Sequence, residues 1–130
     1  MQDLAVILKL YTGDQVKVGT DYGTIRSDIQ FNGMLLDDNE VIFNANRETE
    51  FSKKGTITYS NVDVNVGSAM NTSGIFTAPV SGIYFFHFQS VSQGQSNNYI
   101  NLYHDGKIVS SSYKRVRSDY CFILHTVFLI

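Results

Sequence analysis

The strongest constraint on the fold is the alternation of apolar and polar residues along short segments. Between residues 83 and 91 the chain places Tyr84, Phe86 and Phe88 at alternate positions. Successive side chains of a strand point to opposite faces, so these three rings share one face. No segment repeats apolar residues at helical spacing over three turns. The pattern predicts an all-β protein.

Turn signals divide the chain into many short strands. Asp105-Gly106 predicts a tight hairpin, and Gly13-Asp14 predicts another turn. Loops are expected at 20–28 and 47–54. The expected extended segments are 4–10, 15–19, 29–36, 41–45, 56–66 (as two short pieces), 75–79, 83–91, 99–104, 107–110 and 119–130. Closely spaced short strands predict a jelly-roll sandwich of two antiparallel sheets.

The length and net charge of the chain limit the classes of function that it can have. The chain has 130 residues, 43% of them hydrophobic, which fits one domain with a sizeable core. The formal net charge of -2 argues against a nucleic-acid partner. The only basic cluster is Lys114, Arg115 and Arg117. No apolar run approaches the roughly 20 residues of a membrane span.

No catalytic arrangement is evident, and we expect a protein that is not an enzyme. His87 and His125 lie in strand patterns and are interpreted as structural, whereas His104 precedes a hairpin and is expected to be exposed. Cys121, the single cysteine, lies in an apolar run and is interpreted as a small buried side chain. No His/Cys spacing suits zinc.

From Tyr59 to Phe88 the chain resembles the globular head domain of complement C1q, a family related in fold to the tumour-necrosis-factor ligands. The family pattern is an Asn followed by F-x5-G-x-Y-x-F-x-F. The matching residues are Asn65, Phe76, Gly82, Tyr84, Phe86 and Phe88. Tyr59 stands where the family usually has Phe. Met70 replaces an aromatic residue, and its interval to Phe76 is one residue short.

The order of the matching segments is unusual. Gly13-Asp14-Gln15-Val16 resembles the Gly-Asp-x-Val strand pair near the family's C-terminal end, although Lys17 stands where Trp is common. Residues 31–35 resemble the strand that closes the family domain, and residues 41–45 resemble its first strand. Residues 1–36 thus resemble the family's C-terminal strands, residues 37–40 a joining turn, and residues 41–130 the N-terminal strands.

Two interpretations follow. The chain is a circularly permuted single domain over residues 1–130, or it is cut from a tandem array, with the tail of one domain and the head of the next. We favour the permuted domain because the two pieces complement each other. In the tandem interpretation, residues 1–36 dock on a neighbouring chain.

The resemblance implies a secreted or extracellular homotrimer. It further implies a binding module, lectin-like or for pattern recognition, such as serves innate immunity. The alternative is a structural or cytokine-like trimerisation head that binds a protein receptor. No signal peptide is visible after Met1, and we expect this chain to start after one.

Candidate ligand-binding residues combine aromatic rings with guanidinium groups, which suit stacking on sugars and pairing with carboxylates. The first set is Tyr113, Arg115, Arg117 and Tyr120. The second set is Tyr22 and Arg26, in the expected loop at 20–28.

Two further sites are weighed. Calcium takes oxygen ligands, and the aspartates assigned to turns are Asp3, Asp14, Asp21, Asp37 and Asp38. The resemblance implies a calcium loop before the strand that begins near Leu4, which makes Asp3 the candidate ligand; the alternative is a solvated aspartate. Asn71-Thr72-Ser73 is an N-glycosylation sequence, relevant in a secreted protein.

Overall fold

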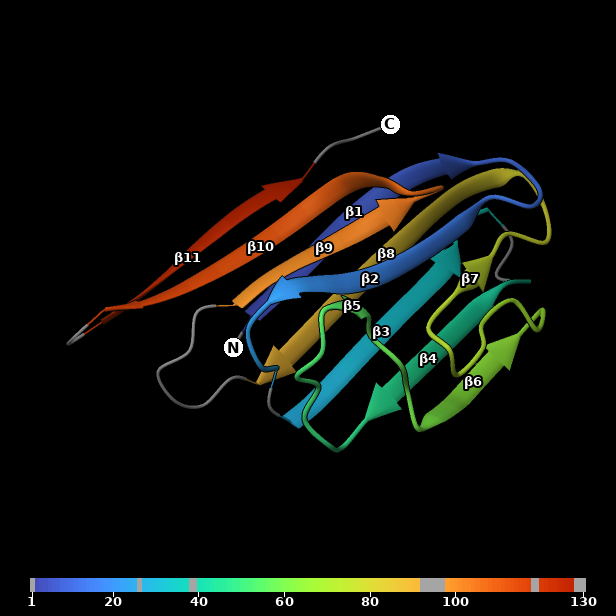
Figure 1. Ribbon diagram of the computed structural model, residues 1–130. Coiled ribbons are helices and arrows are strands. Elements are labelled where there is room, and N and C mark those ends of the chain that lie inside the picture. The colour runs from blue at the N-terminus through green and yellow to red at the C-terminus, as the bar shows by residue number, and fades with distance from the viewer. Residues whose placement is uncertain (1, 26, 38–39, 92–97, 118–119, 128–130) are drawn as a thin grey trace.

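The computed structural model describes residues 2–25, 27–37, 40–91, 98–117 and 120–127, and these form strands without a helix (Figure 1). Within these residues no helix is long and apolar enough to cross a membrane. The strands are β1 (Gln2–Leu10), β2 (Gln15–Tyr22), β3 (Ser27–Leu35), β4 (Ile42–Arg47), β5 (Gly55–Thr56), β6 (Asn61–Val66), β7 (Phe76–Thr77), β8 (Gly82–Val91), β9 (Asn98–His104), β10 (Lys107–Arg117) and β11 (Tyr120–Val127).

The strands form two antiparallel sheets, as the alternation pattern predicts. One sheet, called sheet A here, has the order β1-β8-β3-β4-β6, and sheet B has the order β11-β10-β9-β2-β5, with β7 also paired to β2. The expected all-β jelly-roll sandwich is confirmed.

Aromatic rings fill the space between the sheets. Tyr84, Phe86 and Phe88 are fully buried, which confirms the predicted face of β8. The ring of Phe86 has its centroid 5.2 Å from that of Phe76 and 5.9 Å from that of Phe31. Aromatic pairs at such separations add to the stability gained from burial alone. The core therefore centres on β8, with contributions from both sheets.

The first three strands, β1, β2 and β3, are built into this sandwich and do not flank it. β1 pairs with β8, β3 lies between β8 and β4, and β2 lies between β9 and β5 (Figure 1). The backbone N–H of Leu35 donates a hydrogen bond of 2.9 Å to the carbonyl of Val41, so the end of β3 lies beside the residue that precedes β4.

Two expected loops are more ordered than their polar sequences suggest. β2 continues to Tyr22, and Ile25 and Phe51 are both buried. Their backbones exchange two hydrogen bonds, of 2.9 and 2.7 Å. The prediction of an exposed loop at 20–28 is therefore wrong in part. A single apolar residue in a polar stretch produces no periodicity, so its burial could not be read from the pattern.

Asn65, which matches the family's upstream Asn, closes the loop after β6. Its side-chain nitrogen donates to the carbonyl of Met70 at 2.9 Å, and its oxygen accepts from the N–H of Met70 at 3.2 Å. The amide therefore replaces a backbone partner and holds the buried side chain of Met70 in place.

Candidate functional site

A row of tyrosines crosses sheet B. In the backbone register, Tyr22 of β2 pairs with Tyr99 of β9, which pairs with Tyr113 of β10. The ring centroids of Tyr99 and Tyr113 are 5.5 Å apart. Ile100 and Leu102 are buried at the alternate positions of β9. The two tyrosine rings therefore belong to the outer face of the sheet.

Polar groups continue this face beside the tyrosines. The side-chain nitrogen of Asn101 donates to a carboxylate oxygen of Asp21 at 3.1 Å, and the Asn101 oxygen accepts from the hydroxyl of Ser111 at 2.7 Å. The same nitrogen lies 3.4 Å from the hydroxyl of Tyr103. Asn101 is fully buried within this network, so the network is held in one geometry. We call the surface formed by Asp21, Tyr99, Tyr103, Ser111 and Tyr113, together with the buried Asn101 that links Asp21 to Ser111, the tyrosine face.

A depression adjoins the tyrosine face. It has a volume of about 240 Å³ and is lined by Lys17, Gly55, Thr56, Tyr103 and Gly106. The ammonium of Lys17 lies 5.8 Å from the ring centroid of Tyr103. Flat rings flanked by oriented hydroxyl and carboxylate groups are suited to a polyhydroxylated ligand, whose C–H faces stack and whose hydroxyls both donate and accept.

The structure describes the side chain of only one of the residues predicted to bind a ligand, Tyr113. Tyr113 belongs to the tyrosine face, and the backbone of Tyr22 continues the same row. The backbone of Arg115 pairs with Phe122, and that of Arg117 with Tyr120. The side chains of Tyr22, Arg115, Arg117 and Tyr120 lie outside the described residues, as does the whole of Arg26. The binding roles of these residues stay predictions.

Sequence reasoning missed the other members of the tyrosine face. Tyr99, Asn101 and Tyr103 occupy alternate positions of one strand, and the Asp105-Gly106 hairpin brings β10 back beside them. That alternation was visible in the sequence. The sequence shows a serine at position 111, but the hydrogen bond between Ser111 and Asn101 depends on the register of the β9–β10 hairpin. Asp21 comes from a strand 80 residues away in the chain, so only the fold brings it there.

Among the described residues, no three of the aspartates weighed for calcium form a cluster. Asp3 and Asp21 lie within β1 and β2, which corrects the prediction that they lie in turns. The side chain of Asp3 is 51% exposed, and its carboxylate lies 4.0 Å from the imidazole of His87. Asp37 is exposed, Asp14 contacts a histidine, and Asp38 lies outside the described residues. A calcium role for Asp3 stays a prediction.

Asn71 is exposed, as a glycosylation site must be. Its side-chain oxygen accepts hydrogen bonds from the hydroxyl of Ser73 at 2.6 Å and from the N–H of Ile75 at 3.1 Å. Modification at this position stays a prediction.

Apolar side chains cross the outer face of sheet A in one row. The backbone register pairs Ile7 with Phe85, Phe85 with Met34, Met34 with Ile42, and Ile42 with Val66. We call these five residues the apolar row. Ile7 and Val66 at its two ends are 37% and 48% exposed. A row of this kind spans all five strands of the sheet, which is more than scattered surface apolar residues produce.

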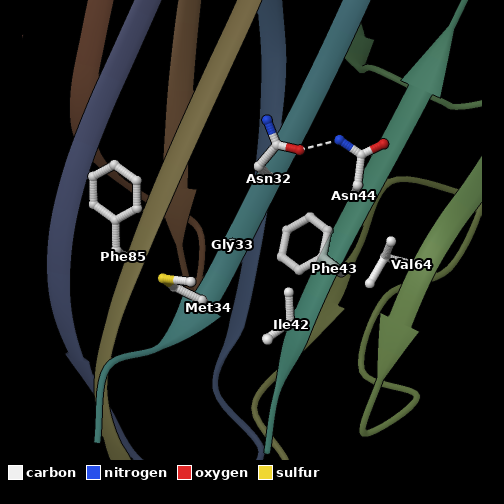
Figure 2. Close-up of a pocket in the computed structure, with 8 residues that line it drawn as sticks. All are labelled: Asn32, Gly33, Met34, Ile42, Phe43, Asn44, Val64 and Phe85. Carbon is white, nitrogen blue, oxygen red and sulfur yellow. Dashed lines mark hydrogen bonds between the residues drawn. The ribbon is translucent and has the colours of Figure 1, made fainter. Parts of the chain in front are cut away.

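A second depression of about 240 Å³ lies in this row (Figure 2). It is lined by Asn32, Gly33, Met34, Ile42, Phe43, Asn44, Val64 and Phe85. The amide of Asn44 donates to the side-chain oxygen of Asn32 along its upper rim in Figure 2. An added Cβ at Gly33 would overlap the ring of Phe43 and lie 2.9 Å from Phe86. The lining is mostly apolar, and its polar groups pair with each other.

Comparison with known proteins gives the family. Residues 42–126 match the C1q domain. Complement C1q tumor necrosis factor-related protein 3 from Homo sapiens is 36% identical over 77 residues, and so is the Mus musculus protein. That stretch covers 57% of this chain and 31% of the relative, so the chain spans less than a third of these relatives. No solved structure matched significantly. Because the C1q match covers more than half of its residues, this chain belongs to the C1q domain family.

Proposed function

We propose that this chain is an extracellular recognition head that assembles as a homotrimer and binds glycans through the tyrosine face. The observation that carries the glycan proposal is the fixed network of Asp21, Asn101 and Ser111 beside the ring pair of Tyr99 and Tyr113. Ligand sites of this kind combine a few oriented polar groups with aromatic surface. A protein receptor is the alternative ligand.

The binding experiment is a glycan array probed with the intact chain, followed by titration of the strongest glycan. We expect Tyr113→Ser and Ser111→Ala each to weaken binding at least tenfold. Tyr11→Ser is the matched control, since Tyr11 is 61% exposed at a distant turn. An array without binding, together with capture of a receptor by the intact chain, would replace the glycan with a protein ligand.

A separate variant tests the predicted basic residues. Should the glycan carry a carboxylate, Arg115→Ala combined with Arg117→Ala abolishes binding and leaves the melting temperature nearly unchanged. Equal binding by this double variant removes the two arginines from the site.

The assembly proposal rests on the apolar row, and we infer that its occupant is a second copy of the chain. Val64 beside the row is 43% exposed and Val66 within it is 48% exposed. Such a surface invites aggregation unless it is covered. Membership of the C1q domain family supports a trimer in particular, because the resemblance to that family implies a homotrimer.

Light scattering tests the assembly. A trimer of the 14.6 kDa chain has three times that mass. We expect Val66→Glu to give the monomer mass, because a carboxylate buried at an interface lacks a partner. Ile108→Glu is the control, since Ile108 is also about half exposed but belongs to the β9–β10 hairpin. A monomeric unsubstituted chain would overturn the proposal.

We further infer that residues 1–130 form one domain with permuted strand order. The support is that β3 supplies the strand between β8 and β4, and the C1q match begins directly after the joining turn. Ala5 and His87 face each other in the register of β1 and β8. Cysteines at both positions, with Cys121→Ala, are expected to form a disulfide within one chain. Crosslinking into dimers would instead support exchange of residues 1–36 between chains.

A further inference from the structure

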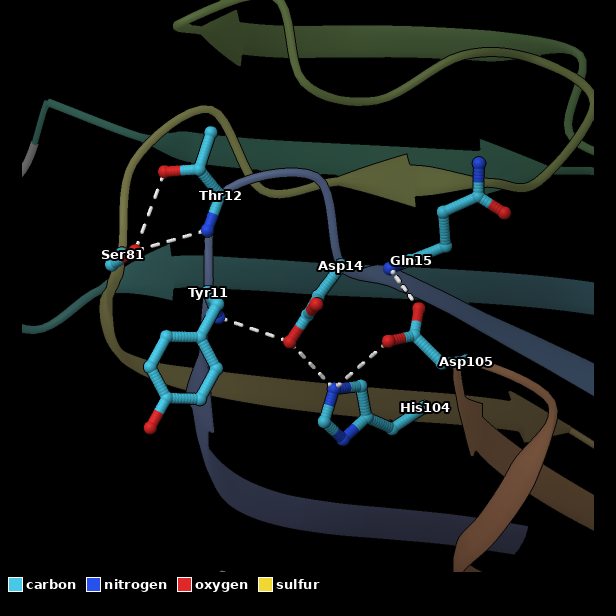
Figure 3. Close-up of polar contacts among 7 residues, drawn as sticks. All are labelled: Tyr11, Thr12, Asp14, Gln15, Ser81, His104 and Asp105. Carbon is cyan, nitrogen blue, oxygen red and sulfur yellow. Dashed lines mark hydrogen bonds and ion pairs between the residues drawn. The ribbon is translucent and has the colours of Figure 1, made fainter.

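The β1–β2 turn, which connects the two sheets, and the β9–β10 hairpin turn meet at one end of the sandwich and bring three ionisable side chains together (Figure 3). The Nε2 atom of His104 lies 2.9 Å from Oδ2 of Asp14 and 3.7 Å from Oδ2 of Asp105. One ligand atom from each residue lies within 4.8 Å of the other two. The sequence predicted an exposed His104, but its side chain is only 19% exposed.

Backbone hydrogen bonds orient both carboxylates. Oδ2 of Asp14 accepts from the N–H of Tyr11 at 3.0 Å, and Oδ1 of Asp105 accepts from the N–H of Gln15 at 2.8 Å. The N–H of Asp105 in turn donates to the carbonyl of Gln15 at 2.9 Å. The β1–β2 turn and the β9–β10 turn are therefore tied together, and the three side chains are held in place before any ligand arrives.

The charges of the cluster favour a cation. The backbone N–H of Tyr11, followed by the hydrogen bond with His104, lowers the pKa of Asp14. One carboxyl oxygen from each of the two aspartates faces the same imidazole nitrogen, that of His104. The side chains of Asp14 and His104 are 18% and 19% exposed, whereas that of Asp105 is 52% exposed. The cluster is shielded on one side and open to solvent on the other.

We propose that Asp14, His104 and Asp105 form a binding site for a divalent transition-metal ion, and that Zn²⁺ is the ion to test. Zinc binds imidazole nitrogen and carboxylate oxygen at about 2.0–2.2 Å, so two ligands of a tetrahedral site lie about 3.3–3.5 Å apart. The separations of 2.9 and 3.7 Å bracket that range. Calcium prefers six to eight oxygen ligands, which one imidazole and two carboxylates do not supply.

Three protein ligands leave a fourth position open. The Asp105 side chain is 52% exposed, so water or an oxygen atom of a ligand can reach the cluster and complete the coordination. The site goes beyond the proposed glycan binding, because none of its residues belongs to the tyrosine face. The sequence pattern did not predict this cluster, because Asp14 and His104 are 90 residues apart in the chain.

Calorimetric titration of the full chain with ZnCl2 tests the site. All proteins carry Cys121→Ala, so that the thiol does not bind the metal. We expect one zinc per chain, and a dissociation constant raised at least tenfold by His104→Gln or Asp105→Asn. His87→Gln is the matched control, because His87 also lies near one carboxylate, that of Asp3 at 4.0 Å. CaCl2 is expected to give no comparable binding.

NMR of the histidine ring nitrogens tests the site without a histidine variant, and therefore also if such a variant does not fold. In the chain with its histidines intact, zinc is expected to shift the ring-nitrogen resonances of His104 and to leave those of His87 unchanged. Absence of zinc binding, or equal binding by the protein with Cys121→Ala alone and by the protein that also carries His104→Gln, would show that the three side chains only tie the two turns together.

Discussion

Replacing Phe86 by alanine tests the centre of the core. Phe86 is fully buried, and its ring has centroids of four other rings within 5.2 to 6.2 Å. A buried Phe→Ala change costs about 3–5 kcal/mol through lost transfer energy and the cavity left behind. Each aromatic pair adds about 0.5–1.5 kcal/mol beyond the buried area. We therefore expect a loss of about 4–5 kcal/mol, near the top of the range.

The assay is urea unfolding at fixed protein concentration, since assembly makes apparent stability depend on concentration. For a domain of this length the same loss lowers the melting temperature by about 10–25 °C. Ile108→Ala is the control and should change stability by less than about 0.5 kcal/mol, because Ile108 is about half exposed. A loss below about 1 kcal/mol for Phe86→Ala would show that the assigned core face is wrong.

Four further changes probe other contacts. Gly33→Ala should cost about 1–3 kcal/mol in urea unfolding, because the new Cβ overlaps the ring of Phe43; an unchanged midpoint would show that β3 and β4 are not so close. Tyr59→Phe should leave stability unchanged or raise it by about 1 kcal/mol, since the buried hydroxyl has no hydrogen-bond partner among the described atoms. Tyr84→Phe should cost about 1 kcal/mol, because that hydroxyl donates to a backbone carbonyl at 2.7 Å; equal effects at the two tyrosines would refute the assignment. In EDTA, Asp14→Asn should destabilise the protein at pH values above the ordinary carboxyl pKa of 3.8 and should lose that effect as the pH falls below it. The sign follows because a lowered pKa of Asp14 stabilises the fold fully above the unfolded-state pKa, and this stabilisation is lost as the pH falls through the lower pKa of the folded state; a pH-independent difference would contradict it.

The sequence by itself determined the class of the fold and the interior of single strands. Alternation is a local property, so Tyr84, Phe86 and Phe88 could be assigned to one buried face without knowledge of their partners. The family pattern around Gly82 was equally local, and the C1q match to residues 42–126 confirms it. Most expected segments became strands for the same reason.

Only the tertiary structure decided which strands lie side by side and in what register. Ile25 forms an isolated β-bridge with Phe51, and Asp14 contacts His104. Both contacts arise because the fold places segments that are distant in the chain side by side. The same holds for the apolar row across sheet A, whose members come from five strands. Register depends on the whole set of strand pairings and turns, and a shift of one residue would send each side chain to the opposite face. A site assembled across strands therefore exists only once the register is set.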